Sequence, residues 1–216
     1  MSTYTCAILS GGEILDYAAV KEELPATDFI ICADSGYRHC RHLDCQPDLL
    51  VGDFDSIGQA LPDGVPVVRL SADKDYTDTA LACEEAVSRG AKRIYLAGFS
   101  GGRLDHTLAN LQTLAGLSAR GIECHMTDGR CTVYALTASA QGNALILQPR
   151  PRHYFSVFAF SGVCKNVAIQ GGKYPLERYD LRFDEARAVS NEFLDGPVTV
   201  SLDEGTLLVT TTPFDR

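Results

Sequence analysis

The sequence lacks long apolar runs and is poor in proline. No apolar stretch approaches the roughly 18 residues that a membrane span requires, and residues 1–5 lack the basic and apolar segments of a targeting signal. With 45% hydrophobic and 22% charged residues and only 9 Pro in 216 residues, the composition excludes disordered, collagen-like and coiled-coil proteins. We expect a globular chain that buries a sizeable core.

Basic residues are also scarce: 19 Lys and Arg stand against 28 Asp and Glu, for a net charge of −9. Such a surface repels polyanions, so nucleic acid is not an expected partner. Small phosphorylated ligands remain compatible with this charge, because bound divalent cations neutralise both acidic side chains and phosphates.

Cys-x-x-Cys pairs are absent, although the chain contains eight cysteines. A chain of this length does not need a disulfide framework, so we expect reduced thiols and a cytoplasmic location. One local group, His39, Cys40, His42 and Cys45, could be interpreted as a zinc site, but its spacings match no familiar zinc pairing. A helix surface with incidental thiols is the preferred interpretation.

Up to about residue 128, short apolar runs alternate with helical stretches. The runs are continuous rather than alternating, as expected for strands that are covered on both faces. This pattern predicts a three-layer, Rossmann-like α/β domain over residues 1–128, with a mostly parallel sheet. The expected strands are 5–9, 29–33, 49–51, 67–70 and 94–97.

Two helices of this domain can be placed from their ends. Thr77 is a plausible N-cap for a helix that ends at Gly90, and Gly121 closes a helix that starts near residue 104. The second helix carries leucines at helical spacing, which we expect in the core: Leu104, Leu108, Leu111 and Leu114.

Beyond residue 129, short apolar runs are separated by turn residues, and helical periodicity is weak. We therefore predict an antiparallel β-sandwich domain over residues 129–216. Its expected strands are 131–136, 144–147, 154–160, 198–202 and 207–211.

Acidic loops follow four of the five predicted parallel strands. In an open parallel sheet, ligands bind at the carboxyl ends of the strands, where these loops converge. Carboxylates gathered at one edge repel each other unless cations are present, and an oxygen-rich site of this kind suits Mg²⁺. Single Asp-x-Asp motifs are usually turns or caps, but four acidic loops favour a metal site. The carboxylates are Asp34, Asp53, Asp55, Asp73, Asp75, Asp78 and Asp105.

Glycine-rich loops supply the complementary part of a phosphate site. Gly101 and Gly102 precede a helix whose free N–H groups can face a phosphate, and Arg103 adds a bidentate donor. The loop at residues 10–12 could act in the same way. Neither a complete G-x-G-x-x-G nor a G-x-x-x-x-G-K-[ST] motif occurs, which excludes typical dinucleotide and Walker-type sites. His106 could contact a phosphate or be an ordinary first-turn residue.

In this order along the chain, the motifs resemble those of the thiamine pyrophosphokinase family. The matching segments are DSG at 34–36, PDLLVGDFDS at 47–56, DKDYTD at 73–78, GGRLDHTLAN at 101–110, KYPL at 173–176 and SNEF at 190–193. The chain departs from the family at Ser35, where a second glycine is usual, and at residues 37–39, where smaller residues are usual.

The resemblance implies that the chain converts ATP and thiamine to thiamine diphosphate and AMP, with Mg²⁺ required. The implied catalytic residues are Asp53, Asp55, Asp78, Arg103 and Asp105, and the implied metal ligands are Asp53, Asp55, Asp73 and Asp78. The implied ATP-binding residues are Asp34, Gly36, Lys74, Gly101, Gly102, Arg103 and His106. Asp105 would accept from the ligand or hold Arg103.

The resemblance also implies a homodimer in which thiamine lies between the α/β domain of one chain and the β domain of the other, with Ser190 and Asn191 as thiamine contacts. Two alternatives use the same carboxylates or the same fold. One is a divalent-metal-dependent phosphohydrolase or nucleotide-dependent transferase, and the other is a non-catalytic nucleotide or thiamine sensor.

Overall fold

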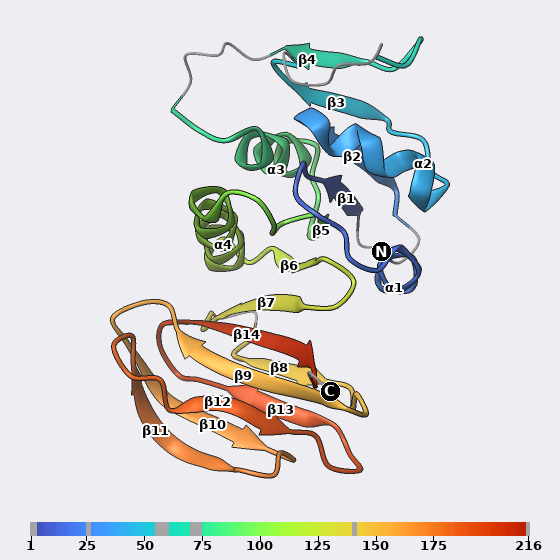
Figure 1. The fold of residues 1–216 in the computed structure, drawn as a ribbon. Helices are drawn as coiled ribbons and strands as arrows, with labels where there is room; N and C mark the ends of the chain where they lie inside the picture. The colour runs from blue at the N-terminus through green and yellow to red at the C-terminus, as the bar shows by residue number, and fades with distance from the viewer. Residues whose placement is uncertain (1–3, 25–26, 55–60, 70–74, 140–141, 215–216) are drawn as a thin grey trace. The chain divides into compact units, whose positions relative to one another are not determined.

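The structure of the chain is a computed structural model that describes residues 4–24, 27–54, 61–69, 75–139 and 142–214 (Figure 1). The chain divides into two units, each of which is described by itself. Unit 1 comprises Met1–Thr113 and Ile122–Arg130, and unit 2 comprises Leu114–Gly121 and Cys131–Arg216. No helix of the described residues is long and apolar enough to cross a membrane.

Unit 1 contains a parallel sheet with the strand order β6-β5-β1-β2-β3-β4, and each of its five neighbouring pairs is parallel. The prediction of a parallel sheet is confirmed. All residues of β1 and β3 are buried, which explains why these strands read as continuous apolar runs. The strands are β1 (Thr5–Leu9), β2 (Phe29–Ala33), β3 (Leu49–Gly52), β4 (Val67–Arg69), β5 (Arg93–Ala97) and β6 (Glu123–Thr127).

Side chains cap two helices of unit 1. Asp16 accepts hydrogen bonds from two backbone N–H groups at the start of α1 (Tyr17–Glu23). Thr77 Oγ1 accepts from the Ala80 N–H at 3.2 Å at the start of α3 (Asp78–Ser88), which confirms the predicted N-cap. The remaining helical segments are the 3₁₀ segment η1 (Asp34–His39), α2 (Cys40–Leu43) and α4 (Leu104–Ala119).

The expectation that all four leucines of α4 lie in the core is wrong. Leu114 is 2% exposed, but Leu104 is 71% and Leu108 is 53% exposed. Ten residues of an α-helix rotate by about 1000°, so Leu114 stands roughly 80° away from Leu104 around the axis. The periodicity identified a helix without identifying its covered face.

The segment around His39 also differs from expectation. A helix surface was predicted there, but His39 and Cys40 are only 2% and 4% exposed. All eight cysteines of the chain are free thiols. In the described ranges, no three His, Cys, Asp or Glu side chains are grouped closely enough to hold a metal ion.

Unit 2 is a sandwich of two antiparallel sheets, as the sequence predicted. The sheet orders are β12-β9-β14-β7 and β11-β10-β13-β8. The strands are β7 (Thr132–Thr137), β8 (Ala144–Leu147), β9 (His153–Ala159), β10 (Val163–Gln170), β11 (Leu176–Arg182), β12 (Ala188–Glu192), β13 (Val198–Ser201) and β14 (Thr206–Pro213).

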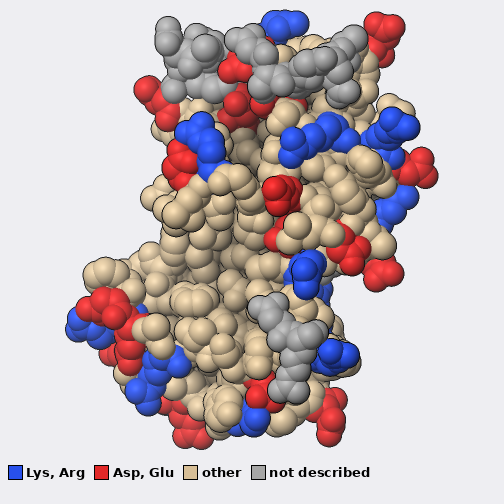
Figure 2. Space-filling model, viewed as in Figure 1, with Lys and Arg blue, Asp and Glu red and all other residues tan. Residues whose placement is uncertain are grey.

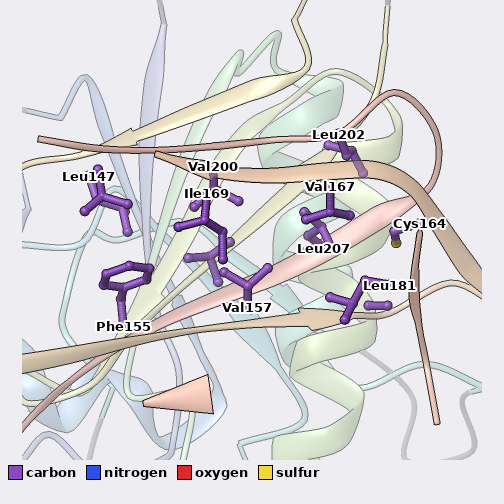
Figure 3. Close-up of a cluster of buried hydrophobic side chains, with 13 residues drawn as sticks. Leu147, Phe155, Val157, Cys164, Val167, Ile169, Leu181, Val200, Leu202 and Leu207 are labelled. Atoms are coloured by element: carbon purple, nitrogen blue, oxygen red, sulfur yellow. The ribbon is translucent and has the colours of Figure 1, made fainter. Parts of the chain in front are cut away.

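The core of unit 2 lies between these two sheets (Figure 3). Phe155 and Leu207 come from one sheet, whereas Ile169 and Leu181 come from the other. The sequence did not predict β10, β11 and β12. Of the seven residues of β11, only Leu181 is buried, so this strand shows too few apolar positions for its periodicity to be recognised.

Candidate active site

A cavity of about 300 Å³ lies in unit 1 beside the carboxyl ends of β1, β2 and β5. Its lining comes from three loops and two helix starts: residues 10–12, 33–35, 77–79, 99 and 101–103, with two further side chains from α4. This is the edge at which an open parallel sheet binds its ligands. Acidic and basic groups are interspersed over the face that Figure 2 shows.

Six of the residues predicted to bind ATP or metal line this single cavity. They are Asp34, Asp78, Gly101, Gly102, Arg103 and His106. Asp53 follows β3 and is half-buried, but it is not part of the lining. Asp105 and Gly36 are also outside the lining, and Asp55, Asp73 and Lys74 lie outside the described residues.

Gly36 is required by the close packing of η1 on the end of β1. A Cβ atom at Gly36 would lie 2.0 Å from the Leu9 carbonyl oxygen, which no side chain can accommodate. Ser35 takes up space in the same region, because a Cβ atom at Gly11 would lie 2.3 Å from the Ser35 Oγ. The serine that departs from the family pattern therefore places a hydroxyl group over Gly11 in the cavity wall.

Arg103 and Asp105 form a bidentate ion pair at the start of α4. Arg103 donates from Nε and Nη2 to the two carboxylate oxygens of Asp105, at 3.2 and 2.5 Å. The hydrogen bonds between these two side chains lower the pKa of Asp105 and raise the pKa of Arg103. Asp105 thus pairs with Arg103 at the edge of the cavity, while a direct contact of Asp105 with a ligand stays a prediction.

Two buried polar residues of the cavity were missed by sequence reasoning. The Thr79 Oγ1 lies 2.7 Å from the Ser10 Oγ, and the Asn110 Nδ2 donates to the Phe99 carbonyl at 2.8 Å. Asn110 is 5% exposed and follows His106 by four residues, which places both on one face of α4. The four-residue spacing of His106 and Asn110 was the sequence feature from which a position of Asn110 beside His106 could have been predicted.

A second cavity, of about 330 Å³, lies in unit 2 and includes Tyr174 and Asn191 in its lining. The Asn191 Oδ1 accepts from the backbone N–H groups of Tyr174 and Glu192 at 3.0 and 2.9 Å, and its Nδ2 donates to the Tyr174 carbonyl at 2.7 Å. These bonds use both acceptor sites and one of the two donor hydrogens of the carboxamide.

Ser190 precedes Asn191 and is exposed, but it is not part of the cavity lining. Its backbone has a φ of 57°, in the left-handed region, and its N–H donates to the Ser156 Oγ at 3.0 Å. The structure therefore brings the two segments KYPL and SNEF together through the side chain of Asn191.

Two family models match the chain. One, described as the catalytic domain of thiamin pyrophosphokinase, matches residues 20–126, and the other, described as the vitamin B1 binding domain of thiamin pyrophosphokinase, matches residues 144–207. A curated relative, the thiamine pyrophosphokinase of Bacillus subtilis (strain 168), is 28% identical over 163 residues, which are 73% of this chain and 75% of the relative.

Solved structures share the fold. The thiamine pyrophosphokinase of Bacillus subtilis superposes with a TM-score of 0.84 at 24% identity, over 98% of this chain and 100% of that chain. The thiamin pyrophosphokinase of Geobacillus thermodenitrificans gives 0.82 at 24% identity, over 98% and 99%. That of Candida albicans gives 0.73 at 14% identity, over 98% and 90%.

Proposed function

The chain belongs to the thiamine pyrophosphokinase family, and from this membership we infer that it is a thiamine diphosphokinase, a transferase that converts ATP and thiamine to thiamine diphosphate and AMP. The observation that carries this inference within the structure is the cavity of unit 1. It joins a carboxylate, a glycine-rich helix start and an arginine at the ligand-binding edge of a parallel sheet.

We propose that this cavity receives the phosphates of ATP. The backbone of Gly101 and Gly102 can approach phosphate oxygens closely because neither residue carries a side chain, and both adopt positive φ values of 94° and 71°. Arg103, held by Asp105, supplies a fixed positive charge for the group in transfer. Asp34, Gly36, His106 and Lys74 complete the proposed ATP site.

Carboxylate oxygens fit Mg²⁺, the cation proposed for this reaction. Asp78 lines the cavity at the start of α3, and Asp53 is half-buried just after strand β3. With Asp55 and Asp73 they form the proposed ligand set. Mg²⁺ usually binds through one or two carboxylates together with substrate phosphates, and when bound it neutralises charge on the phosphate oxygens.

Positioning and electrostatics dominate phosphoryl-type transfers, so the proposal assigns no general base. The hydroxyl oxygen of thiamine attacks the β-phosphorus of ATP, the bond from that phosphorus to the α,β-bridging oxygen breaks as AMP leaves with that oxygen, and the hydroxyl proton is released to water. Arg103 stabilises the negative charge that develops on the transferring group, and His106 contacts the phosphates from the first turn of α4.

We propose that residues 1–128 bind ATP and residues 129–216 bind thiamine and form a homodimer. Ser190 and Asn191 are the proposed thiamine contacts, each site combining one half from each chain. Among the described residues, the hydrogen bonds of Asn191 leave one donor hydrogen of its carboxamide, which we assign to the ligand, while its other polar atoms bond the backbone of Tyr174 and Glu192. A cytoplasmic location remains part of this proposal.

Nucleotide product analysis tests the function directly. The purified chain is incubated with ATP and Mg²⁺, with and without thiamine, and AMP and ADP are separated and quantified. AMP that forms only with thiamine, in equal amount to thiamine diphosphate, supports the proposal. ADP or phosphate released without thiamine would instead indicate a phosphohydrolase, and nucleotide binding without any turnover would indicate a sensor.

A further inference from the structure

Two side chains of η1 hold the loop that follows β1. The Nη2 of Arg38 donates to the carbonyl oxygens of Gly11 and Gly12, at 2.7 and 2.9 Å. The Nε2 of His39 lies 2.9 Å from the same Gly12 oxygen. Gly11 and Gly12 line the cavity of unit 1, whereas Arg38 and His39 do not, so both side chains act on the loop instead of on the contents of the cavity.

The partners of His39 define its tautomer. A carbonyl oxygen only accepts, so Nε2 carries the hydrogen, and Nδ1 accepts from the Tyr17 hydroxyl at 2.7 Å. His39 is 2% exposed, and burial lowers its pKa to about 4. The ring is therefore neutral near pH 7, with a donor on Nε2 that faces the Gly12 carbonyl and the Ser10 backbone and an acceptor on Nδ1 that faces the Tyr17 hydroxyl.

The opposite sides of the same peptide groups are bonded to the loop after β5. The Gly12 N–H donates to the Gly98 carbonyl at 2.9 Å, and the Glu13 N–H donates to the Ser100 carbonyl at 2.7 Å. Two successive peptide groups are thus fixed at both their oxygen and nitrogen ends. Ser100 directly precedes the segment Gly101–Arg103, so the loop connects η1 to the proposed phosphate-binding segment.

Close packing leaves this connection little freedom. A Cβ atom at Gly12 would lie 2.3 Å from the Gly98 carbonyl oxygen, and a Cβ atom at Gly98 would lie 2.7 Å from the Ser10 carbonyl oxygen and 3.3 Å from the His39 Nε2. A shift of the Gly12 carbonyl must therefore be passed to the loop after β5, because no side-chain volume separates the two backbones.

We propose that His39 and Arg38 are positioning residues of the ATP site, that Tyr17 orients the His39 ring by donating to its Nδ1, and that together they set the geometry of the loop at residues 10–13 and, through it, of Gly101–Arg103. The proposal rests on the proposed function for its substrate, ATP. None of the three residues touches the reacting atoms.

The main test replaces His39 by leucine, which removes the donor, and by glutamine, which keeps a neutral N–H donor. His39→Leu is expected to lower kcat/KM for ATP about tenfold or more, the effect of losing one hydrogen bond to a positioned group, with the KM for thiamine changed less than twofold. His39→Gln is expected to recover most of this loss. The matched control is His153→Leu, the same exchange at a histidine of β9 in unit 2 that lies outside the lining of the unit 1 cavity.

Arg38→Gln tests the guanidinium against Arg38→Lys, with Arg41→Gln as the control for loss of one positive charge from the neighbouring helix α2. If Arg38 acts by donating to the Gly11 and Gly12 carbonyls, Arg38→Gln keeps an N–H donor and is expected to retain part of the wild-type activity. If Arg38 instead acts by its charge on a phosphate, Arg38→Gln is expected to lose nearly all activity. Full rescue by Arg38→Lys with no activity in Arg38→Gln would show that Arg38 acts through its charge on the nucleotide, and would overturn its assignment.

Two readouts do not depend on turnover. Imidazole ¹⁵N NMR at pH 7 is expected to show His39 as the Nε2–H tautomer in the wild type and in Tyr17→Phe, because the Gly12 carbonyl accepts from Nε2 in both. Calorimetric titration with Mg²⁺ and a non-hydrolysable ATP analogue is expected to show about tenfold weaker binding to His39→Leu.

The outcomes separate this proposal from the proposed function. If the wild-type chain forms no thiamine-dependent AMP, the proposed function is wrong. The calorimetric titration with the ATP analogue still tests the positioning role, because it measures nucleotide binding without turnover. His39→Leu that melts cooperatively and keeps kcat/KM for ATP and nucleotide affinity within twofold would overturn the proposal. If His39→Leu does not fold, the same titration is carried out with Tyr17→Phe, which removes only the hydroxyl oxygen that faces His39 Nδ1. Weaker binding of the ATP analogue to Tyr17→Phe supports the proposal, and unchanged binding overturns it.

Discussion

Asn191→Ala removes one side chain that supports the cavity of unit 2. Asn191 is 3% exposed and its carboxamide makes three hydrogen bonds, two of them to the backbone of Tyr174. After truncation, the Tyr174 N–H and C=O lose the partners that the carboxamide provides. The β12 strand and the segment containing Tyr174 are then no longer joined through these bonds.

The magnitude follows from the number of bonds and from the burial. Each hydrogen bond contributes about 1 kcal/mol net, so losing three lowers the free energy of unfolding by about 3 kcal/mol. Water that reaches the partly buried Tyr174 backbone reduces this figure toward about 2 kcal/mol. Removal of the carboxamide also leaves a void next to Gly172, whose hypothetical Cβ lies 3.1 Å from both terminal atoms of Asn191.

Two assays measure the effect. Urea unfolding followed by circular dichroism reports the change in free energy, and hydrogen exchange of the Tyr174 amide reports the bond to the Asn191 Oδ1. Faster exchange of this amide is expected in Asn191→Ala. Ser190→Ala is the matched control. Because Ser190 is exposed, the free energy of unfolding of this variant is expected to change by less than about 0.5 kcal/mol. The KM of this variant for thiamine rises if Ser190 contacts the substrate.

The reasoning would be refuted by an Asn191→Ala chain with wild-type stability and an unchanged exchange rate at Tyr174. A rise in the KM for thiamine without any loss of stability would show that Asn191 acts only as a ligand contact and that its bonds to Tyr174 contribute nothing measurable.

Three further predictions concern charge and assembly. Asp53→Asn and Asp78→Asn are each expected to abolish nearly all turnover while preserving the fold, and full activity of both at saturating Mg²⁺ would rule out their role as metal ligands. Burial lowers the pKa of His39 in the folded state to about 4 from 6.5, so its contribution to stability is complete above pH 6.5 and declines as the pH falls toward 4, by up to about 3 kcal/mol. Urea unfolding at a series of pH values should show a smaller decline in stability for His39→Gln than for the wild type. Parallel stability curves of the two chains would contradict this. In a mixed dimer of Asn191→Ala and Asp53→Asn chains, one shared site is intact, so activity up to about half of wild type is expected, whereas no gain over the parent homodimers would place each site within one chain.

Local sequence patterns determined much of the fold. In unit 1, β1 is a continuous apolar run because all of its residues are buried, and β2 buries its last three residues, so both strands could be placed at their observed bounds. The Thr77 cap was likewise predictable, since a side-chain oxygen at a helix start satisfies a local N–H group. The strand β11 was not, because it buries little apolar surface.

The sequence also indicated which candidate residues gather at one site. The rule that ligands bind at the carboxyl ends of parallel strands grouped Asp34, Asp78 and Arg103, which are far apart in sequence, and all three line one cavity. Asp34 follows β2, Asp78 begins α3 and Arg103 precedes α4, so their shared location depends on the parallel strands and on the helix starts that follow them.

Only the tertiary structure decided how individual side chains are used. The burial of His39, its bond to Gly12 and the bonds between Asn191 and Tyr174 join segments that no local pattern links. The exposed position of Leu104 on α4 depends in the same way on which helix face is covered. Periodicity and motifs reflect interactions between neighbours along the chain, whereas hydrogen bonds across 17 to 27 residues depend on how the elements pack.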